Sequence, residues 1–367
     1  MQIGLNFVTP LWTGGASRQA NRVQNTGLLG SLRWWYEVII RGLGGWACDP
    51  TDDHHRCQLD TNGFKAALEQ GCLHLGKGKL CPTCEAQALS ANGLCAACQM
   101  FGATGWAKTM TVVLKDETIP EYPPTGSGRV KTTGERLNLK KEPSAWYFNE
   151  GRGQTLALTV LPRRAGDAVA ESVCLGLLEF IRRNAALGAK TALGYGLFDW
   201  GEPLDNLPPA SDFAQALAHR AAIGRVGSKE RWPDLREMFF AWIDLKEKWA
   251  HSDFANFKYD LRQAFRSNTI TPDLRHFLLG DIQRDPHQAS KIKMALWPNK
   301  SVLQLWGWIP GQLPEAQGKI NRAALINLLR AELSKIGTIS HWRQFDSPLD
   351  TDTHYTAPQA YLESLMR

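Results

Sequence analysis

The sequence predicts an α+β protein, because strand and helix patterns alternate along the chain in a recurring order. In residues 1–202 the order is strand, helix, strand, strand, helix, strand. This order is the split βαβ arrangement of ferredoxin-like and RRM-like domains. Residues 231–367 repeat it in a weaker, more helical form after a proline-rich linker at 203–230, so we predict two ferredoxin-like domains.

The elements of the first half are predicted from apolar spacing, which has a period of three to four residues in helices and of two in strands. A segment at about 48–98 holds seven of the eight cysteines and has little period of its own, so we interpret it as an insertion folded around metal. The predicted elements are strands at 3–8, 108–114, 155–161 and one ending at residue 200, with helices at 26–41 and 171–183.

The second half contains a trace of internal duplication. Gln99-Met-Phe-Gly102 and Phe277-Leu-Leu-Gly280 each precede a lysine, Lys108 or Lys291, and then a predicted strand, which favours a true repeat. The predicted elements of this half are helices at 235–249, 257–265 and 320–336, with strands at 292–297 and 302–309.

Charge and composition are those of a soluble globular protein, and they allow an acidic partner without requiring one. The net charge is +6, and one glycine- and proline-flanked segment carries a local charge of +4 that suits a basic finger for nucleic acid. Its charged residues are Arg129, Lys131, Glu135, Arg136, Lys140 and Lys141. Because neither a signal peptide nor a run of 18 apolar residues occurs, we expect a cytoplasmic protein whose cysteines stay reduced.

Two C-x-x-C pairs are the strongest chemical signal. Cys81, Cys84, Cys95 and Cys98 can present four thiolates to one structural zinc ion, a closed site without room for a catalytic water. An iron–sulfur cluster is the alternative metal. Further potential ligands could form a second site or replace one ligand; they are Cys48, His54, His55, Cys57, Cys72 and His74. Cys174 lies in an apolar helix and is assigned to the core.

A glycine-rich loop follows the second predicted helix. Gly188, Gly194 and Gly196 surround Lys190 and Thr191, which suits close approach of backbone N–H groups to a phosphate. The loop is neither a Walker loop nor a dinucleotide fingerprint, because the spacing differs and the order is helix, glycines, strand. An ordinary helix stop is the alternative interpretation.

The first predicted helix combines basic and aromatic residues. Arg18 and Arg22 precede it, and Arg33 and Trp34 lie within it. Arginine binds phosphate through its planar fork, and tryptophan can stack on an unpaired base. The alternative is that the tryptophans of this helix belong to the core.

Several ordered motifs resemble the RAMP superfamily of CRISPR proteins, most of all the first-subunit family of the type III-B (Cmr) effector complexes. They are Thr9-Pro-Leu-Trp-Thr-Gly-Gly15, Gly27-Leu-Leu-Gly-Ser-Leu-Arg-Trp-Trp-Tyr36, Cys98-Gln-Met-Phe-Gly102, the glycine loop at 188–196 and Leu305-Trp-Gly-Trp-Ile-Pro310. The resemblance implies two ferredoxin-like domains and a non-catalytic RNA-binding subunit in antiviral defence. Its implied partners are guide RNA near its 3′ end, target RNA and other Cmr-type subunits.

The resemblance and the basic residues together define an expected RNA-binding set. Arg33 would face RNA, and Lys108 and Lys291 would be equivalent lysines of the two halves. The full set is Arg18, Arg22, Arg33, Trp34, Lys108, Arg129, Lys131, Arg136, Gly188, Lys190, Thr191, Gly194, Tyr195, Gly196 and Lys291.

Two other functions compete with this one. Some RAMP relatives that process guide RNA are metal-independent endoribonucleases, which need a general base. His276, just before Gly280, is the best placed histidine for that role. A zinc-dependent DNA-binding regulator is less well supported, because the sequence lacks helix-turn-helix and C2H2 spacings.

Overall fold

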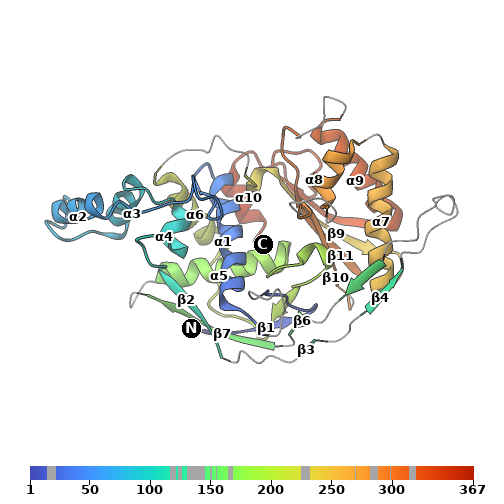
Figure 1. Ribbon diagram of the computed structural model, residues 1–367, viewed down its shortest axis with the longest axis horizontal. Coiled ribbons are helices and arrows are strands. Elements are labelled where there is room, and N and C mark those ends of the chain that lie inside the picture. Colours follow the sequence, from blue (N-terminus) through green and yellow to red (C-terminus); the bar gives the residue numbers. More distant parts are fainter. Residues whose placement is uncertain are drawn as a thin grey trace.

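The computed structural model contains two four-stranded antiparallel sheets with helices packed on them (Figure 1). The α+β class predicted from the sequence is therefore confirmed. The structure describes residues 1–14, 22–115, 121–122, 126–129, 145–148, 151–153, 155–163, 168–224, 232–268, 270–281, 288–297, 299–313 and 320–367.

The first sheet has the strand order β2-β7-β1-β8, and every neighbouring pair is antiparallel. Helices α1 and α5 are the two crossovers, so the chain follows the split βαβ path. The elements are β1 (Gln2–Phe7), α1 (Asn25–Gly42), β2 (Met110–Leu114), β7 (Thr155–Pro162), α5 (Ala168–Asn184) and β8 (Phe198–Trp200). Each of them overlaps an element predicted from the sequence.

The second sheet repeats this topology in the order β10-β11-β9-β12, again with antiparallel neighbours. In both sheets the first strand of the half therefore lies between its third and fourth strands. The elements are β9 (Met238–Leu245), α7 (His251–Ser267), β10 (Ile292–Trp297), β11 (Val302–Trp308), α9 (Arg322–Ile336) and β12 (Gly337–Gln344).

The helix predicted at 235–249 is wrong. The structure has a short 3-10 turn, η3 (Leu235–Glu237), followed by strand β9. A continuous apolar run such as Met238-Phe-Phe-Ala-Trp-Ile243 has no alternation, because both faces of β9 are buried. Periodicity cannot separate such a strand from a buried helix. Strand β12 was not predicted. It lies at the edge of the sheet, so about half of its sequence is polar and the apolar pattern of a strand is weak.

The internal repeat predicted from the two glycine elements corresponds to equivalent places in the fold. Helix α4 (Ala96–Phe101) ends at Gly102 with φ 92° and ψ 155°, and α8 (Pro272–Leu279) ends at Gly280 with φ 78° and ψ 161°. Both backbone conformations are ones that only glycine adopts readily. In each half the next strand, β2 or β10, carries the chain into the sheet.

The segment predicted as a linker at 203–230 contains a helix. Helix α6 (Ala210–Ala222) packs between α5 and the C-terminal helix α10 (Pro358–Ser364). Phe213 and Leu217 of α6 are buried in the same core as Tyr361 of α10. The end of the chain therefore returns to the first half and covers it.

The cysteine-rich segment between α1 and β2 projects from the body of the protein, at the left of Figure 1. It contains α2 (Thr61–Gln70), α3 (Pro82–Ala91) and α4. Between β2 and β7 lie two small hairpin pairs, β3 (Glu121–Tyr122) with β6 (Gly151–Arg152), and β4 (Gly126–Arg129) with β5 (Ala145–Phe148). The β4 strand lies beside α7 of the second half.

One hydrophobic core joins the two halves. On β9, Phe239, Ala241 and Ile243 face the helices of the second half, whereas Phe240 faces the first half. The Phe240 ring lies 6.2 Å from Trp35 of α1 and 5.8 Å from Phe180 of α5. The face of the second sheet that an RRM-like domain would leave open is thus largely covered by α1 and α5.

Candidate metal clusters and nucleic-acid interface

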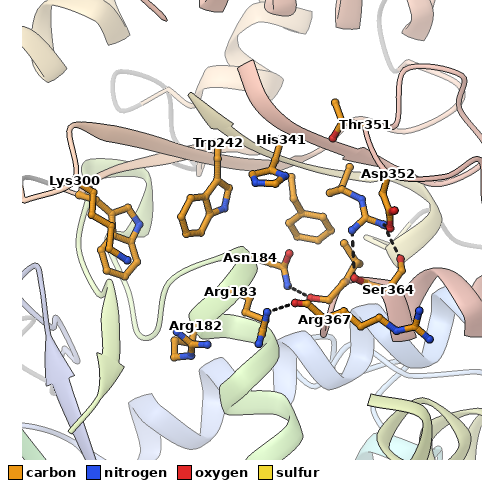
Figure 2. A pocket seen from close by; sticks show the side chains of 14 residues that line it. Arg182, Arg183, Asn184, Trp242, Lys300, His341, Thr351, Asp352, Ser364 and Arg367 are labelled. Carbon is orange, nitrogen blue, oxygen red and sulfur yellow. Dashed lines mark hydrogen bonds and ion pairs between the residues drawn. The ribbon is translucent and has the colours of Figure 1, made fainter. Parts of the chain in front are cut away.

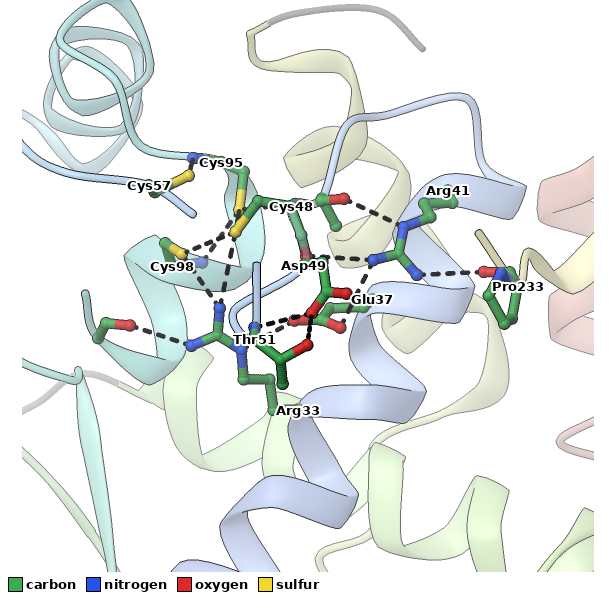
Figure 3. A network of polar contacts seen from close by, with 12 residues as sticks. Arg33, Glu37, Arg41, Cys48, Asp49, Thr51, Cys57, Cys95, Cys98 and Pro233 are labelled. Carbon is green, nitrogen blue, oxygen red and sulfur yellow. Dashed lines mark hydrogen bonds and ion pairs between the residues drawn. The ribbon is translucent and has the colours of Figure 1, made fainter. Parts of the chain in front are cut away.

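An inner cysteine cluster lies where the inserted segment meets α1. The sulfur atoms of Cys48, Cys57, Cys95 and Cys98 lie within 4.8 Å of one another, and all four residues are buried. The Cys98 N–H donates to Cys95 Sγ at 3.4 Å, and the Cys95 N–H donates to Cys57 Sγ at 3.3 Å. Four converging thiols, with N–H groups directed at sulfur, could hold one metal ion (Figure 3).

An outer cluster lies at the start of α3. Cys72, His74, Cys81 and Cys84 place one ligand atom each within 4.8 Å of the others. The Cys84 N–H donates to Cys81 Sγ at 3.3 Å, and the Cys81 N–H donates to Cys72 Sγ at 3.1 Å. In the structure Cys72 and Cys84 are joined as a disulfide. Unlike the inner cluster, this one contains an exposed ligand, His74.

The predicted single site of Cys81, Cys84, Cys95 and Cys98 is not what the fold forms. Each C-x-x-C pair starts a helix, so Cys81 caps the start of the ten-residue helix α3, and Cys95 follows the end of that helix. Ten helical residues span about 15 Å, whereas one zinc ion needs all four sulfurs about 2.3 Å away. Each pair is instead completed by residues that precede it in the chain. His54 and His55 belong to neither cluster.

Arg33 faces the inner cluster instead of the solvent. Its guanidinium donates to Cys98 Sγ at 3.1 Å, to the Gly102 carbonyl at 3.1 Å and to Glu37 Oε1 at 2.8 Å. Burial opposes its charge, but attraction to Cys98 and Glu37 raises its pKa above the ordinary arginine value. The expected RNA contact of Arg33 is therefore replaced by a contact inside the protein, because the side chain is only 16% exposed.

Glu37 and Arg41 extend this network to the second half. The Glu37 carboxylate is 5% exposed and lies 2.8 Å from Arg33 Nε and 3.5 Å from an Arg41 nitrogen. Burial raises the pKa of Glu37, and the two arginines oppose that shift. Arg41 also donates to the carbonyls of Cys48 and Pro233, both at 3.2 Å. Helix α1 is thus tied to the cysteine cluster and to the segment that leads into β9 (Figure 3).

The glycine loop uses its backbone on the protein itself. The N–H groups of Gly188, Ala189 and Gly196 donate to Ser31 Oγ, the Trp12 carbonyl and the Pro10 carbonyl at 3.1, 2.8 and 2.9 Å. A Cβ on Gly196 would lie 1.9 Å from the Leu187 carbonyl oxygen. The glycines therefore permit close packing against residues 10–12, and these three N–H groups are not directed at a phosphate.

The side chains of the loop are also mostly covered. Gly194, Thr191 and Tyr195 are buried, with 7% exposure for Thr191 and 1% for Tyr195. Lys190 is half-buried and sits at φ 55°, with its Nζ 3.1 Å from the centre of the Trp12 ring. Of the polar loop side chains, Lys190 is the one positioned to meet a ligand.

Three lysines lie where the two halves meet, and a fourth, Lys291, lies close enough to Lys293 to repel its charge. Besides Lys190, Lys258 of α7 donates to the Ala192 carbonyl, and β10 runs beside the 3-10 turn η2 (Thr191–Leu193). Lys293 Nζ lies 4.6 Å from the Trp34 ring, and Lys291 Nζ lies 5.5 Å from the Phe277 ring. We call Lys190, Lys258, Lys291 and Lys293 the seam lysines.

Burial makes the seam lysines unusually easy to deprotonate. It lowers the pKa of all four, and for Lys258 and Lys293 the pKa falls to about 8. Repulsion from Lys291 adds to the effect of burial at Lys293. In the described part of the chain none of the four forms an ion pair with a carboxylate. Desolvated positive charge without an acidic partner favours an anionic ligand.

The other members of the expected RNA-binding set are dispersed. Arg22 is exposed ahead of α1, Lys108 is half-buried ahead of β2, and Arg129 ends β4. Trp34 is half-buried beside Lys293 and so belongs to the seam. Three members lie outside the described residues: Arg18, Lys131 and Arg136.

A pocket of about 440 Å³ opens between the end of α5 and the second sheet (Figure 2). Trp242 of β9 and His341 of β12 line it, with their ring centres 6.4 Å apart and their ring planes at 87°. Trp242 also stacks on Trp297 at 6.1 Å and 26°, and Lys300 Nζ lies 4.3 Å from the Trp297 ring. The pocket thus combines aromatic surface with a cation, the combination that binds unpaired bases.

Most of the arginines at this pocket already have acidic partners. Arg182 pairs with Glu179 at 2.7 Å, and Arg343 pairs with Asp350 at 3.0 Å. Trp242, His341 and Lys300 are the side chains left to meet a ligand. Sequence reasoning missed this pocket, because its residues come from five separate elements and the loops beside them, and no single tryptophan among fourteen is distinctive.

Strand β10 connects the seam lysines with the pocket. Its residues alternate, so Ile292, Met294 and Leu296 face the core of the second half, while Ala295 and Trp297 face the first half. Lys293 shares the face of Ala295 and Trp297 by the same alternation. Lys293 and Trp297 therefore lie about 13 Å apart along β10, on the side of the strand that packs on the first half.

A family model described as the RAMP superfamily matches residues 5–199, more than half of the chain. The chain belongs to the RAMP superfamily. The match covers the first sheet, α1, α5 and the inserted segment, and it stops just before the end of β8. The second sheet lies outside the match, although it repeats the topology of this RAMP domain.

Solved structures with similar folds include Cmr1 from Pyrococcus furiosus in its apo form. It is 11% identical, with coverage of 91% of this chain and 96% of that chain and a TM-score of 0.44. A second is a chain of the type III-B Cmr-beta complex bound to cognate target RNA, at 10% identity, with 91% and 98% coverage and a TM-score of 0.44. No curated protein sequence matches this RAMP protein. Every helix in the described parts of the chain is too short or too polar to span a membrane.

Proposed function

We propose that this RAMP protein is a non-catalytic guide-RNA-binding subunit of a type III-B CRISPR ribonucleoprotein that targets RNA in antiviral defence. The observation that carries the proposal is the row of seam lysines between two ferredoxin-like halves. Membership in the RAMP superfamily and the motifs of the Cmr type support the same assignment. Its partners would be guide RNA near the 3′ end, the adjacent target RNA and other Cmr-type subunits.

The chemistry of the seam favours single-stranded RNA. Lysines meet phosphates as point charges, and Lys190 and Lys293 lie over the rings of Trp12 and Trp34. A base that stacked on a part of either ring that the lysine leaves free would bring its phosphate close to the lysine. Duplex nucleic acid has its bases stacked inside and could not use these rings.

The pocket at Trp242 would hold one unpaired base of the RNA that the seam lysines bind. His341 and Lys300 flank the tryptophan and could bond to base edges or phosphate. Trp242→Ala would remove the stacking surface, which is worth about 1–3 kcal/mol per base. Trp242→Phe retains an aromatic face and should retain most of the affinity.

The metal expected from the cysteine pairs would be a structural zinc ion in the inner cluster. Four buried thiolates leave no coordination position for water, so this site would stabilise the fold and supply no hydrolytic chemistry. Arg33 would offset part of the negative charge of the thiolates by its hydrogen bond to Cys98.

One observation favours the competing endoribonuclease function. His276 Nδ1 lies 2.5 Å from an oxygen of the buried Asp281, an arrangement that can orient an imidazole as a general base. The binding proposal expects His276→Ala to leave both guide binding and target cleavage by the assembled complex intact. Site-specific cutting of repeat RNA by the pure protein, lost in His276→Ala, would instead make the chain a nuclease.

The decisive experiment isolates the native protein from its host and sequences the RNA that it carries. Guide RNAs with a shared repeat-derived sequence are expected, together with copurifying effector subunits. A matched chain with Lys190, Lys258, Lys291 and Lys293 changed to glutamine should lose that RNA. Recovery of duplex DNA, or of no nucleic acid from either protein, would contradict the proposal.

A further inference from the structure

We propose that the reduced protein binds a second zinc ion at the outer cluster of Cys72, His74, Cys81 and Cys84. The proposal extends the inner zinc site described above. It rests on the geometry of four ligand atoms that already lie within 4.8 Å of one another. Three thiolates and one imidazole are a common ligand set for structural zinc.

The backbone around the outer cluster is arranged as a metal-binding turn. Cys81 is the N-cap of α3, and Pro82 at the first helical position fixes the turn that brings Cys84 back toward it. The Cys84 N–H donates to Cys81 Sγ, as the Cys98 N–H donates to Cys95 Sγ in the inner cluster. The two C-x-x-C turns therefore have the same local hydrogen bond.

A second turn delivers the remaining two ligands. The N–H groups of Leu75 and Gly76 donate to the Cys72 carbonyl at 2.9 and 2.8 Å, and the Cys72 N–H donates to the Lys79 carbonyl at 2.9 Å. Gly71 has φ 67°, and a Cβ there would lie 2.0 Å from the Gly76 carbonyl oxygen. This tight loop holds Cys72 and His74 toward the start of α3. It has few apolar contacts of its own, since Leu73 and Leu75 are exposed.

The segment that holds the outer cluster buries little apolar surface, and this is the physical reason to expect a metal there. Helix α2 has no buried residue, and α3 buries only Ala86, Leu89 and Ser90. A segment that buries so little apolar surface needs a disulfide or a metal to stay folded. The Cys72–Cys84 disulfide would do this under oxidising conditions, but it leaves Cys81 and His74 without a shared role. A zinc ion would use all four residues in a reducing compartment.

Reduction followed by zinc binding converts the disulfide form of the outer cluster to the zinc-bound form. A thiol or phosphine reductant supplies two electrons, and with two protons it converts the Cys72–Cys84 disulfide to two thiols. Zinc binding then displaces the protons from the three thiols and takes the neutral imidazole of His74 as the fourth ligand.

The test is the zinc content of the full-length protein, purified with a phosphine reductant and without chelator. Two zinc ions per chain are expected. The pair Cys81→Ser with Cys84→Ser should leave one zinc ion, and Cys174→Ala, which changes a buried cysteine outside both clusters, should leave two. One zinc ion in the unchanged protein, with Cys72 and Cys84 recovered as a disulfide peptide, would overturn the outer site. No zinc at all would overturn the inner site as well.

A milder pair of variants guards against misfolding of the double mutant. His74→Ala removes one exposed ligand and should make one of two zinc ions at least tenfold faster to extract with a chelator. Leu73→Ala changes the exposed neighbouring residue and should leave extraction of both ions unchanged. Cobalt substitution supplies a second readout, because three sulfurs with one nitrogen give a different visible spectrum from four sulfurs. Equal rates of zinc extraction from the unchanged protein, His74→Ala and Leu73→Ala would exclude His74 as a ligand.

Discussion

Arg33 and Arg262 make the same contact in the two halves of the protein. Each guanidinium donates to the carbonyl of the glycine that ends a short helix, Gly102 at 3.1 Å and Gly280 at 2.9 Å. Each arginine lies on the first helix of its half, and each glycine precedes the second strand. The repeat thus preserves an arginine that fixes the short helix, and in the first half the same arginine also reaches the inner cysteine cluster.

Arg33→Ala is therefore expected to reduce stability rather than RNA affinity. The change leaves Glu37 buried without its nearest partner, which should lower the free energy of unfolding by about 3 kcal/mol. Chemical denaturation measures the loss. Arg56→Ala, which removes an exposed ion pair with Asp53, should change stability by less than about 1 kcal/mol. If the Arg33→Ala protein were as stable as the unchanged protein but bound RNA weakly, Arg33 would contact RNA and this prediction would be wrong.

Gly196→Ala should destabilise the fold strongly. Gly196 has φ 87°, and the added Cβ would lie 1.9 Å from the Leu187 carbonyl oxygen. Strain and overpacking together should cost about 2–4 kcal/mol, measured as a lower thermal midpoint. Gly30→Ala is the control, because its Cβ would meet nothing within 4 Å, and it should stabilise α1 by about 0.5–1 kcal/mol.

RNA affinity should depend steeply on salt through the seam lysines. Each phosphate contact on single-stranded RNA contributes about 0.7 to the slope of log K against log salt concentration. Changing Lys190, Lys258, Lys291 and Lys293 to glutamine should therefore flatten the slope by up to about 3. Fluorescence anisotropy with a labelled guide RNA gives the slope. A second variant with Arg129, Lys131 and Arg136 changed tests the basic finger in the same way. An unchanged slope in the seam variant would exclude the seam as the interface.

RNA affinity should also fall as pH rises through about 8. Burial lowers the pKa of Lys258 and Lys293 from 10.5 to about 8, so both are charged at pH 7 and neutral at pH 9 in the unbound protein. RNA binds the charged forms, and each lysine that must regain a proton can reduce affinity by up to about tenfold per pH unit above 8. Lys258→Arg with Lys293→Arg should remove most of this decline, since arginine stays charged. A flat profile in the unchanged protein from pH 7 to 9 would contradict the proposed contacts.

The same lowered pKa values should make the folded protein more stable, not less, as the pH rises. Between about pH 8 and 10.5 the unfolded lysines retain a proton that Lys258 and Lys293 have lost in the folded state. The unfolded state then binds more protons, so these two residues make the free energy of unfolding rise with pH in that window. The contributions of these two lysines to the free energy of unfolding and to RNA affinity, measured on one sample, should therefore change in opposite directions over this pH window.

Local sequence patterns were sufficient to predict the features that depend on neighbouring residues. Alternation and helical spacing placed every main element of the first half, and the repeated glycine after a short helix located equivalent points of the two halves. The C-x-x-C spacing identified both cysteine turns, because four consecutive residues fix that geometry. The continuous apolar run of β9 was assigned to a helix, because burial on both faces erases the period that separates strand from helix.

Which distant residues meet depends on tertiary packing, and no local pattern predicted it. The rigid helix α3 keeps Cys81 and Cys95 apart and gives each a different partner pair, which no spacing rule could supply. The close packing of the glycine loop on residues 10–12 turned its N–H groups inward, and the packing of α4 on α1 turned Arg33 toward Cys98. Lys190, Lys258 and Lys293 come from three separate elements, and they form one seam because a single hydrophobic core brings the two halves together.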